Sequence, residues 1–209
     1  MNNPDEVKDF TFDEISETAV IKAIGHYPAG KQASAVMALL DIAQRQMGRM
    51  AGSAWVPRVA MDVIAKRLGM APIRVYEMAT FYLMYNTKPV GKFHLQVCTT
   101  TPCWLRGSDE VVAACKKISG LNLFGETTED GLFTMSEVEC LGACVNAPIL
   151  QINDDYYEDL DGARTEELLR ALKEGGAPPA PGSTIGRHAS APITGQTALL
   201  QTDPAESTC

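Results

Sequence analysis

FHLQVCTTTPC, residues 93–103, joins a strand pattern directly to a pair of cysteines. Every second residue from Phe93 to Val97 is apolar, which is typical of a half-buried strand. That strand would end at Cys98, and Cys103 follows in a turn rich in small residues. Loops carried on a rigid scaffold commonly hold functional residues. The segment therefore predicts a sheet with a cysteine site at its edge.

A second cysteine pair lies in ECLGAC, residues 139–144, after another strand pattern at 133–139. The two pairs have the spacings Cys98-x4-Cys103 and Cys140-x3-Cys144. Four thiolates in two close pairs suit a structural zinc ion or an iron–sulfur cluster, because both centres take soft sulfur ligands around a tetrahedral metal. The spacing alone leaves these two kinds of site open.

Disulfide bonds are a third possibility, which the sequence disfavours. Six cysteines in 209 residues are a modest density, and we expect no secretory leader, since the first residues lack its basic and apolar regions. Cys115 falls in an apparent helix, where a free thiol commonly packs as a small hydrophobic side chain. Cys209 is the last residue. Neither has a partner at ligand spacing, so we expect both to lie outside the metal site.

Four motifs follow one another along the chain: ATFY at 79–82, PVGK at 89–92, VC-x4-CWLRG at 97–107 and ECLGACVNAP at 139–148. In this order they resemble the thioredoxin-like [2Fe–2S] subunit of respiratory complex I, the NADH:quinone oxidoreductase. The resemblance covers about residues 11 to 175. It implies that Cys98, Cys103, Cys140 and Cys144 hold one binuclear [2Fe–2S] cluster, and it favours iron–sulfur over zinc.

The N-terminal part of the chain, residues 1–87, predicts a four-helix bundle that docks a partner. Thr11-x-x-Glu14 has the pattern of a capping box, and the first helix would turn Ile15 toward a core. Pro57 and Pro72 each stand where a helix can start with proline. The expected helices are residues 11–25, 32–50, 57–69 and 72–86.

Residues 88–175 predict a thioredoxin-like [2Fe–2S] domain with a mixed sheet, so the fold class is α+β. After the strand at 93–98 we expect a helix at 108–118, a strand at 133–139, a hairpin of 149–152 with 156–158, and a closing helix at 165–173. Residues 176–209 are rich in Pro, Ala and Gly and bury too little apolar surface to fold by themselves. We expect them to be mobile or to form an extended arm on a partner.

Composition narrows the class of partner. The chain carries 18 basic and 26 acidic residues, a net charge of −8, which disfavours binding to nucleic acid or to an anionic membrane surface. No run of about 18 apolar residues offers a membrane span. We therefore expect no direct insertion into the membrane. The resemblance to the complex I subunit implies a cytoplasmic bacterial protein, held at the inner face of the membrane through the complex.

Three further sites have ordinary structural explanations. Asp154 and Asp155 stand between two strand patterns and indicate a turn rather than an acid–base pair. His94 is expected to be a polar strand position, because four cysteines already fill the site. Trp104 suits either a shield for the cluster or a core position. No nucleotide-binding glycine motif occurs, and we expect no complete active site in this chain.

The resemblance implies a redox subunit of the proton-translocating NADH:quinone oxidoreductase that binds no substrate itself. A larger partner would bind NADH and FMN in a tight heterodimer with this chain, and further peripheral-arm subunits would join them. Similar subunits serve NAD-reducing hydrogenases and NAD-linked formate dehydrogenases, so the choice of complex stays open here. A zinc-stabilised adaptor without redox activity is the alternative of a different class.

Overall fold

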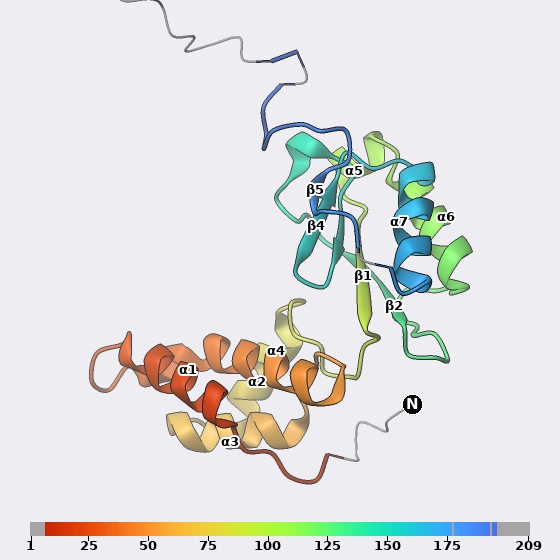
Figure 1. Ribbon diagram of the computed structural model, residues 1–209. Coiled ribbons are helices and arrows are strands. Elements are labelled where there is room, and N and C mark those ends of the chain that lie inside the picture. Colours follow the sequence, from red (N-terminus) through yellow and green to blue (C-terminus); the bar gives the residue numbers. More distant parts are fainter. Residues whose placement is uncertain (1–6, 177, 193, 196–209) are drawn as a thin grey trace, which may run out of the picture. The chain divides into compact units, whose positions relative to one another are not determined.

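The computed structural model describes residues 7–176, 178–192 and 194–195. The chain forms two compact units, one of Met1–His94 with Gly125–Met135 and one of Leu95–Phe124 with Ser136–Cys209. The first, which we call the helical unit, is mainly helical, and the second, the sheet unit, carries most of the sheet (Figure 1). Both cysteine pairs lie in the sheet unit. The predicted α+β class is confirmed.

The first unit contains the four predicted helices around one apolar core. Leu39, Leu40, Met61 and Ile64 are almost fully buried in it. Helices pair in sequence order, and α2 also contacts α4. The helices are α1 (Glu14–Gly25), α2 (Val36–Ala51) preceded by a short 3-10 helix η1 (Gln32–Ala35), α3 (Arg58–Leu68) and α4 (Pro72–Phe81).

The start of α1 differs from the prediction. Asp13, not Thr11, caps the helix, and its side chain accepts a hydrogen bond from the Ser16 amide at 2.7 Å. The buried Gln46 of α2 donates to the Thr11 carbonyl at 2.7 Å and accepts from the Asp13 amide at 3.0 Å. Hydrogen bonds with Gln46 of α2 thus fix the backbone directly before α1. Ile15, expected in the core, is 71% exposed.

The end of α4 also differs from the prediction, because the helix stops at Phe81 rather than near Asn86. Contacts with α2 hold the chain in a different path beyond that point. The Tyr85 hydroxyl donates to the Met37 carbonyl at 2.8 Å, and the Asn86 amide donates to the Gln44 side chain at 2.7 Å. The Asn86 amide thus donates to a side chain of α2 instead of to a helical carbonyl.

The sheet has five strands in the order β2-β1-β3-β4-β5. Strand β3 is antiparallel to β1 and β4, and β5 is parallel to β4, so the sheet is mixed as predicted. The contacting helices α6 and α7 lie side by side next to it (Figure 1). The strands are β1 (Phe93–Cys98), β2 (Phe133–Val138), β3 (Leu150–Ile152), β4 (Asp155–Glu158) and β5 (Gly182–Ser183), and the helices are α5 (Thr101–Leu105), α6 (Ser108–Ser119), the 3-10 helix η2 (Cys144–Asn146) and α7 (Gly162–Lys173).

Part of the predicted tail packs on the chain itself. Strand β5 adds to β4 through the register Tyr157 with Gly182 and Glu158 with Ser183. Residues 182 and 183 are therefore extended and paired with the sheet of the chain itself, while contact of the tail with a partner stays a prediction. The prediction for residues 196–209 lies outside the described residues. Within the described part of the chain, no helix combines the length and the apolar character needed to cross a membrane.

Candidate metal centre

The first cysteine pair lies where β1 passes into α5. Cys98 is the last residue of β1 and Cys103 lies in α5. Each is only 1% exposed, and both belong to an apolar cluster with Ala147 and Ile149. This half of the site is sealed from solvent by the fold of the sheet unit.

The second pair lies in the loop after β2 and is open to solvent. The sulfurs of Cys140 and Cys144 are 3.3 Å apart, and the Gly142 amide donates to the Cys140 sulfur at 3.4 Å. Gly142 has a φ of 81°, a left-handed conformation that favours glycine. Cys140 is exposed and Cys144 is partly exposed.

Hydrogen bonds across the two loops bring the pairs into one site. The Cys98 sulfur lies 3.1 Å from the Thr100 hydroxyl, which also bonds to Cys140. The Leu141 amide, from the second loop, donates to Cys98. Cys98 and Cys103 are both free thiols, and the Cys103 thiol donates a hydrogen bond to the Cys98 sulfur. All four predicted ligands are therefore neighbours.

The thiol pKa values divide in the same way in each pair. Burial opposes ionisation of Cys98, but hydrogen bonds from Thr100 and Leu141 outweigh it and lower the pKa. Burial and the Cys98 side chain raise the pKa of Cys103 to about 12. The Gly142 amide lowers the pKa of Cys140, whereas the bond with Cys140 raises the pKa of Cys144. In each pair one thiol is thus the stronger acid, and metal binding would release the protons still bound to the four thiols.

The arrangement of the four thiols in two pairs fits a binuclear centre. Among residues 7–176, 178–192 and 194–195, no three His, Cys, Asp or Glu side chains converge to hold one metal ion. A [2Fe–2S] cluster with four cysteine ligands has two thiolates on each iron. Two adjacent thiol pairs are the donor set that such a cluster takes.

Other residues singled out in the sequence lie as follows. Cys115 is fully buried in α6, as expected of a packed thiol, and burial raises its pKa to about 12. His94 lies in β1 as a buried polar residue, and burial lowers its pKa to about 4. Trp104 is 57% exposed, so the core position is wrong. Asp154 lies in the turn between β3 and β4. Cys209 falls outside the described residues.

Sequence reasoning missed the polar residues that support the loops. Thr100 contacts both pairs and was detectable as a hydroxyl two residues after Cys98. The Tyr156 hydroxyl of β4 donates to the Leu141 carbonyl at 3.0 Å. Arg187 donates to the Val145 carbonyl from the C-terminal segment at 3.3 Å. No local pattern marks these last two contacts, because each joins distant parts of the chain.

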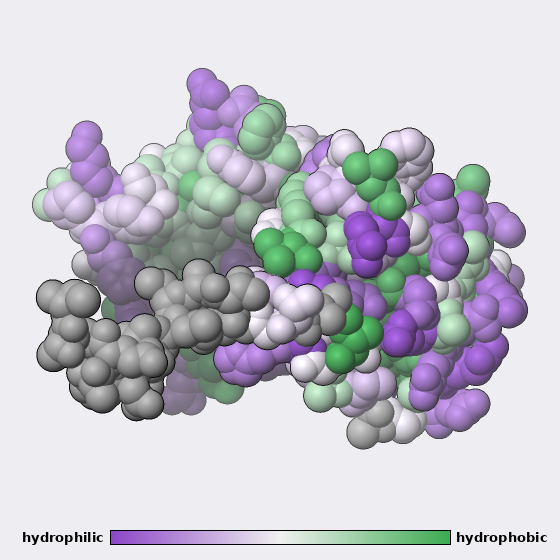
Figure 2. Space-filling view, turned by 90° about the horizontal axis from the view of Figure 1, so that it is seen from above, coloured by the Kyte–Doolittle hydropathy of each residue, from purple (hydrophilic) through white to green (hydrophobic). Residues whose placement is uncertain are grey.

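Apolar side chains are exposed next to the cysteines along the chain. Trp104 and Leu105 follow Cys103, and Val145 follows Cys144. Their exposed fractions are 57%, 70% and 64%. Figure 2 looks down on the end of the sheet unit that carries α5 in Figure 1, and it shows hydrophobic residues open to the surface there.

Known proteins resemble this chain over most of its length. The model of the family "Thioredoxin-like [2Fe-2S] ferredoxin" matches residues 20–173. An NADH-quinone oxidoreductase subunit from Rickettsia conorii is 51% identical over 168 residues, which cover 80% of this chain and 97% of the relative. The "NADH dehydrogenase [ubiquinone] flavoprotein 2, mitochondrial" of Dictyostelium discoideum is 45% identical over 208 residues, which cover 100% of this chain and 80% of the relative.

A solved structure shares the fold at much lower identity. The NAD+-reducing [NiFe]-hydrogenase in its air-oxidized state superimposes with a TM-score of 0.54 and 18% identity, over 67% of this chain and 23% of that chain. This likeness concerns the fold alone. The family match and the identity to curated relatives go further: the chain belongs to the thioredoxin-like [2Fe–2S] ferredoxin family, in the group that contains this subunit of bacterial NADH-quinone oxidoreductase and the mitochondrial flavoprotein 2.

Proposed function

We propose that Cys98, Cys103, Cys140 and Cys144 hold one [2Fe–2S] cluster, and that the chain exchanges single electrons with FMN on the NADH-binding subunit of NADH:quinone oxidoreductase. The observation that carries this proposal is the convergence of two thiol pairs from two loops of one sheet unit. Family membership supports the type of cluster, and the NADH-quinone oxidoreductase relatives support the type of complex.

A [2Fe–2S] cluster bound there supplies one-electron redox chemistry. The protein orients the thiolates and adjusts their charge. The amides of Leu141 and Gly142 and the Thr100 hydroxyl stabilise negative charge on sulfur, which favours reduction. Glu139 acts in the opposite direction, since its charge opposes ionisation of Cys140. The balance of these groups sets the reduction potential.

The exposed apolar residues beside the cysteines support a partner-binding role. Trp104, Leu105 and Val145 lie within two residues of a proposed ligand and are each more than half exposed. Apolar and aromatic side chains are enriched in the centres of protein interfaces. We propose that the FMN-bearing subunit covers them in a tight heterodimer, which would exclude water from the open cysteine pair. Through further peripheral-arm subunits the complex would lie at the inner, cytoplasmic face of the membrane.

Serine substitutions test the ligand set. Cys140→Ser and Cys103→Ser are expected to abolish the EPR signal of the reduced chain or to change its g-values, because a hydroxyl is a poorer ligand for iron than a thiolate. Cys115→Ser, the matched control, should retain the signal, since Cys115 is buried in α6 and does not belong to the apolar cluster of Cys98 and Cys103. Iron and inorganic sulfide analysis should give two of each per chain. An unchanged spectrum in Cys140→Ser would remove it from the ligand set.

Metal and sulfide analysis tests the zinc alternative, and purification of the native complex tests the choice of enzyme. A colourless protein with one zinc ion and no sulfide would establish a structural adaptor. An equivalent subunit of an NAD-reducing hydrogenase would hold the same cluster. The 51% identity to the Rickettsia conorii relative favours the oxidoreductase, because the likeness to the hydrogenase, at 18% identity, concerns the fold alone. Purification of the native complex followed by identification of the FMN-bearing chain and its companions decides between these two enzymes.

A further inference from the structure

The segment after α7 returns to the sheet unit and is fastened along β4. We call residues 182–189, which include β5, the C-terminal arm. The Thr184 amide and hydroxyl both donate to the Glu158 carbonyl at 3.0 Å, and the hydroxyl also donates to the Asp159 carbonyl at 2.8 Å. The Ser183 hydroxyl donates to the Asp159 carboxylate at 2.6 Å. Sheet pairing and side-chain bonds thus hold the arm in one register.

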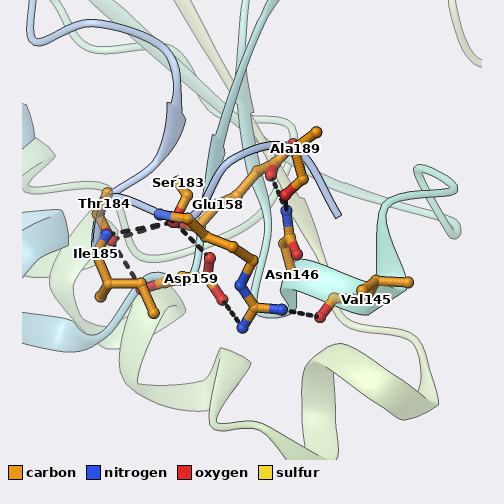
Figure 3. A network of polar contacts seen from close by, with 9 residues as sticks. Val145, Asn146, Glu158, Asp159, Ser183, Thr184, Ile185 and Ala189 are labelled. Carbon is orange, nitrogen blue, oxygen red and sulfur yellow. Dashed lines mark hydrogen bonds and ion pairs between the residues drawn. The ribbon is translucent and has the colours of Figure 1, made fainter. Parts of the chain in front are cut away.

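An arginine of the arm reaches the loop that carries the open cysteine pair. Arg187 forms an ion pair with Asp159 at 3.0 Å, and the two side chains are only 11% and 5% exposed. Its other terminal nitrogen donates to the carbonyl of Val145 at 3.3 Å. Val145 directly follows Cys144. Figure 3 shows this network between the arm, the end of β4 and the loop.

A second contact fastens the same loop to the arm. The side-chain amide of Asn146 donates to the Glu158 carboxylate at 2.5 Å and to the Ala189 carbonyl at 2.9 Å. The Asp159 amide donates back to the Asn146 carbonyl at 2.7 Å. The two residues of η2 that follow Cys144 are Val145 and Asn146. Both are held by hydrogen bonds with β4 or the C-terminal arm. Between Cys140 and Cys144, the Leu141 carbonyl accepts a hydrogen bond from the Tyr156 hydroxyl.

We propose that Arg187 is a positioning residue for the metal centre: by joining Asp159 to the Val145 carbonyl, the C-terminal arm fixes Cys144 and Cys140 in the geometry that retains iron. This inference rests on the proposed function, because it assumes that these cysteines are ligands. It assigns a role to a segment that composition alone marks as a tail. The buried pair Cys98 and Cys103 is held by the core. The open pair depends on the contacts of Arg187 with Asp159 and Val145, which we call the clamp.

The clamp predicts opposite effects for its two charged ends. Replacement of Arg187 leaves the buried Asp159 carboxylate without its counter-charge, and an uncompensated negative charge disfavours the added electron. Arg187→Gln should therefore lower the midpoint potential, and Asp159→Asn, which leaves the arginine uncompensated, should raise it. Loosening of the loop should also speed the release of iron to a chelator by about tenfold or more, in line with supporting groups at other metal sites.

The experiment uses the full chain with its cluster. Iron release to a ferrous chelator, EPR g-values and midpoint potential are measured for wild type, Arg187→Gln, Arg187→Lys and Asp159→Asn. Arg170→Gln is the matched control, because Arg170 pairs with Glu166 on α7 with its own side chain 52% exposed. Circular dichroism checks the fold. Arg187→Lys keeps the charge opposite Asp159 but lacks the second branch that reaches Val145, so intermediate release is expected.

Each outcome has one meaning. If wild type holds no cluster, the proposed function fails before the clamp is tested. If wild type holds a cluster and Arg187→Gln matches Arg170→Gln in release, g-values and potential, the clamp is refuted. If Arg187→Gln does not fold, Arg187→Lys decides, and release at the wild-type rate from that variant overturns the proposal. Faster release with potential shifts of opposite sign in the two charge variants supports it.

Discussion

Individual residues make the two halves of the metal centre unlike each other. Cys98 and Cys103 are 1% exposed and lie in an apolar cluster, whereas Cys140 is exposed. Solvent, chelators and oxidants therefore reach the second pair first. The Leu141 and Gly142 amides, which donate hydrogen bonds to cysteine sulfurs, both belong to the exposed loop between Cys140 and Cys144. The conformation of this loop therefore affects both the charge on sulfur and the access of solvent to it.

Buried His94 predicts a specific dependence of stability on pH. Burial lowers its pKa in the folded state to about 4, below the value of 6.5 expected when unfolded. As pH falls from about 6.5 to about 4, the unfolded chain takes up a proton that the folded chain does not, so the free energy of unfolding decreases. The pKa shift corresponds to roughly 3 kcal/mol of unfolding free energy. This stability is fully present above about pH 6.5 and is lost as the pH falls to about 4.

His94→Gln should lose this contribution to the pH dependence. Urea unfolding of wild type and variant is followed by circular dichroism at several values between about pH 4 and 7, and the difference in unfolding free energy is plotted against pH. His26→Gln, at an exposed histidine, is the control and should follow wild type. A difference between wild type and His94→Gln that does not vary with pH would contradict the assignment.

At the scale of elements, α4 ends early and leaves apolar side chains uncovered. Phe81, Leu83 and Met84 are 76%, 63% and 57% exposed. Tyr85 and Asn86, directly after them, are tied to α2, so the chain cannot continue the helix and bury them. Consecutive exposed apolar residues of this size are typical of interaction surfaces.

We predict that this surface contributes to binding of the FMN-bearing subunit. The double variant Phe81→Ser with Leu83→Ser should bind that subunit about tenfold more weakly, since truncation of an important interface side chain costs more than about 1 kcal/mol. Its own stability should change by less than about 0.5 kcal/mol, as for other surface substitutions. Titration calorimetry measures the affinity. Leu123→Ser, at a 65% exposed leucine of the sheet unit, is the control, and an equal loss in that variant would contradict the prediction.

At the scale of the molecule, we propose a division of labour between docking and redox parts. All four proposed ligands and all five strands lie beyond residue 88. The helices of residues 1–87 have their own buried core. The structure groups Gly125–Met135 with the helical unit and the described part of the tail with the sheet unit. A redox fragment therefore has to include the C-terminal arm.

Two fragments test this division. Residues 88–209 should assemble a coloured cluster and bind the FMN-bearing subunit much more weakly than the full chain, because the helical unit and its exposed apolar residues are missing. Residues 88–175 lack Arg187 and should release iron faster than the longer fragment. Absorption spectra and chelator assays measure both properties, with residues 1–87 as a helical, colourless control. Cluster assembly that requires residues 1–87 would show that the division is wrong.

The sequence by itself determined the features that depend on neighbours along the chain. Alternation of apolar residues placed β1, and apolar residues at helical spacing placed α2, each to within a few residues. Pro57 and Gly69 bounded α3 in the same way. Pro72 marked the start of α4, because proline fits the first turn of a helix and its missing amide is not needed there. Both cysteine pairs fell at the ends of predicted strands, so their loops could be assigned to the same sheet.

Only the tertiary structure decided the contacts between distant residues. Gln46 joins the start of α1 from 33 positions away and makes Asp13 its cap, and Arg187 joins Asp159 across 28 positions. The burial of His94 and the exposure of Ile15 and Trp104 depend likewise on which elements pack over them. A local pattern records the period of a helix or strand but not its neighbour. For this reason the cysteines could be predicted from the sequence, whereas the groups that hold their loops could not.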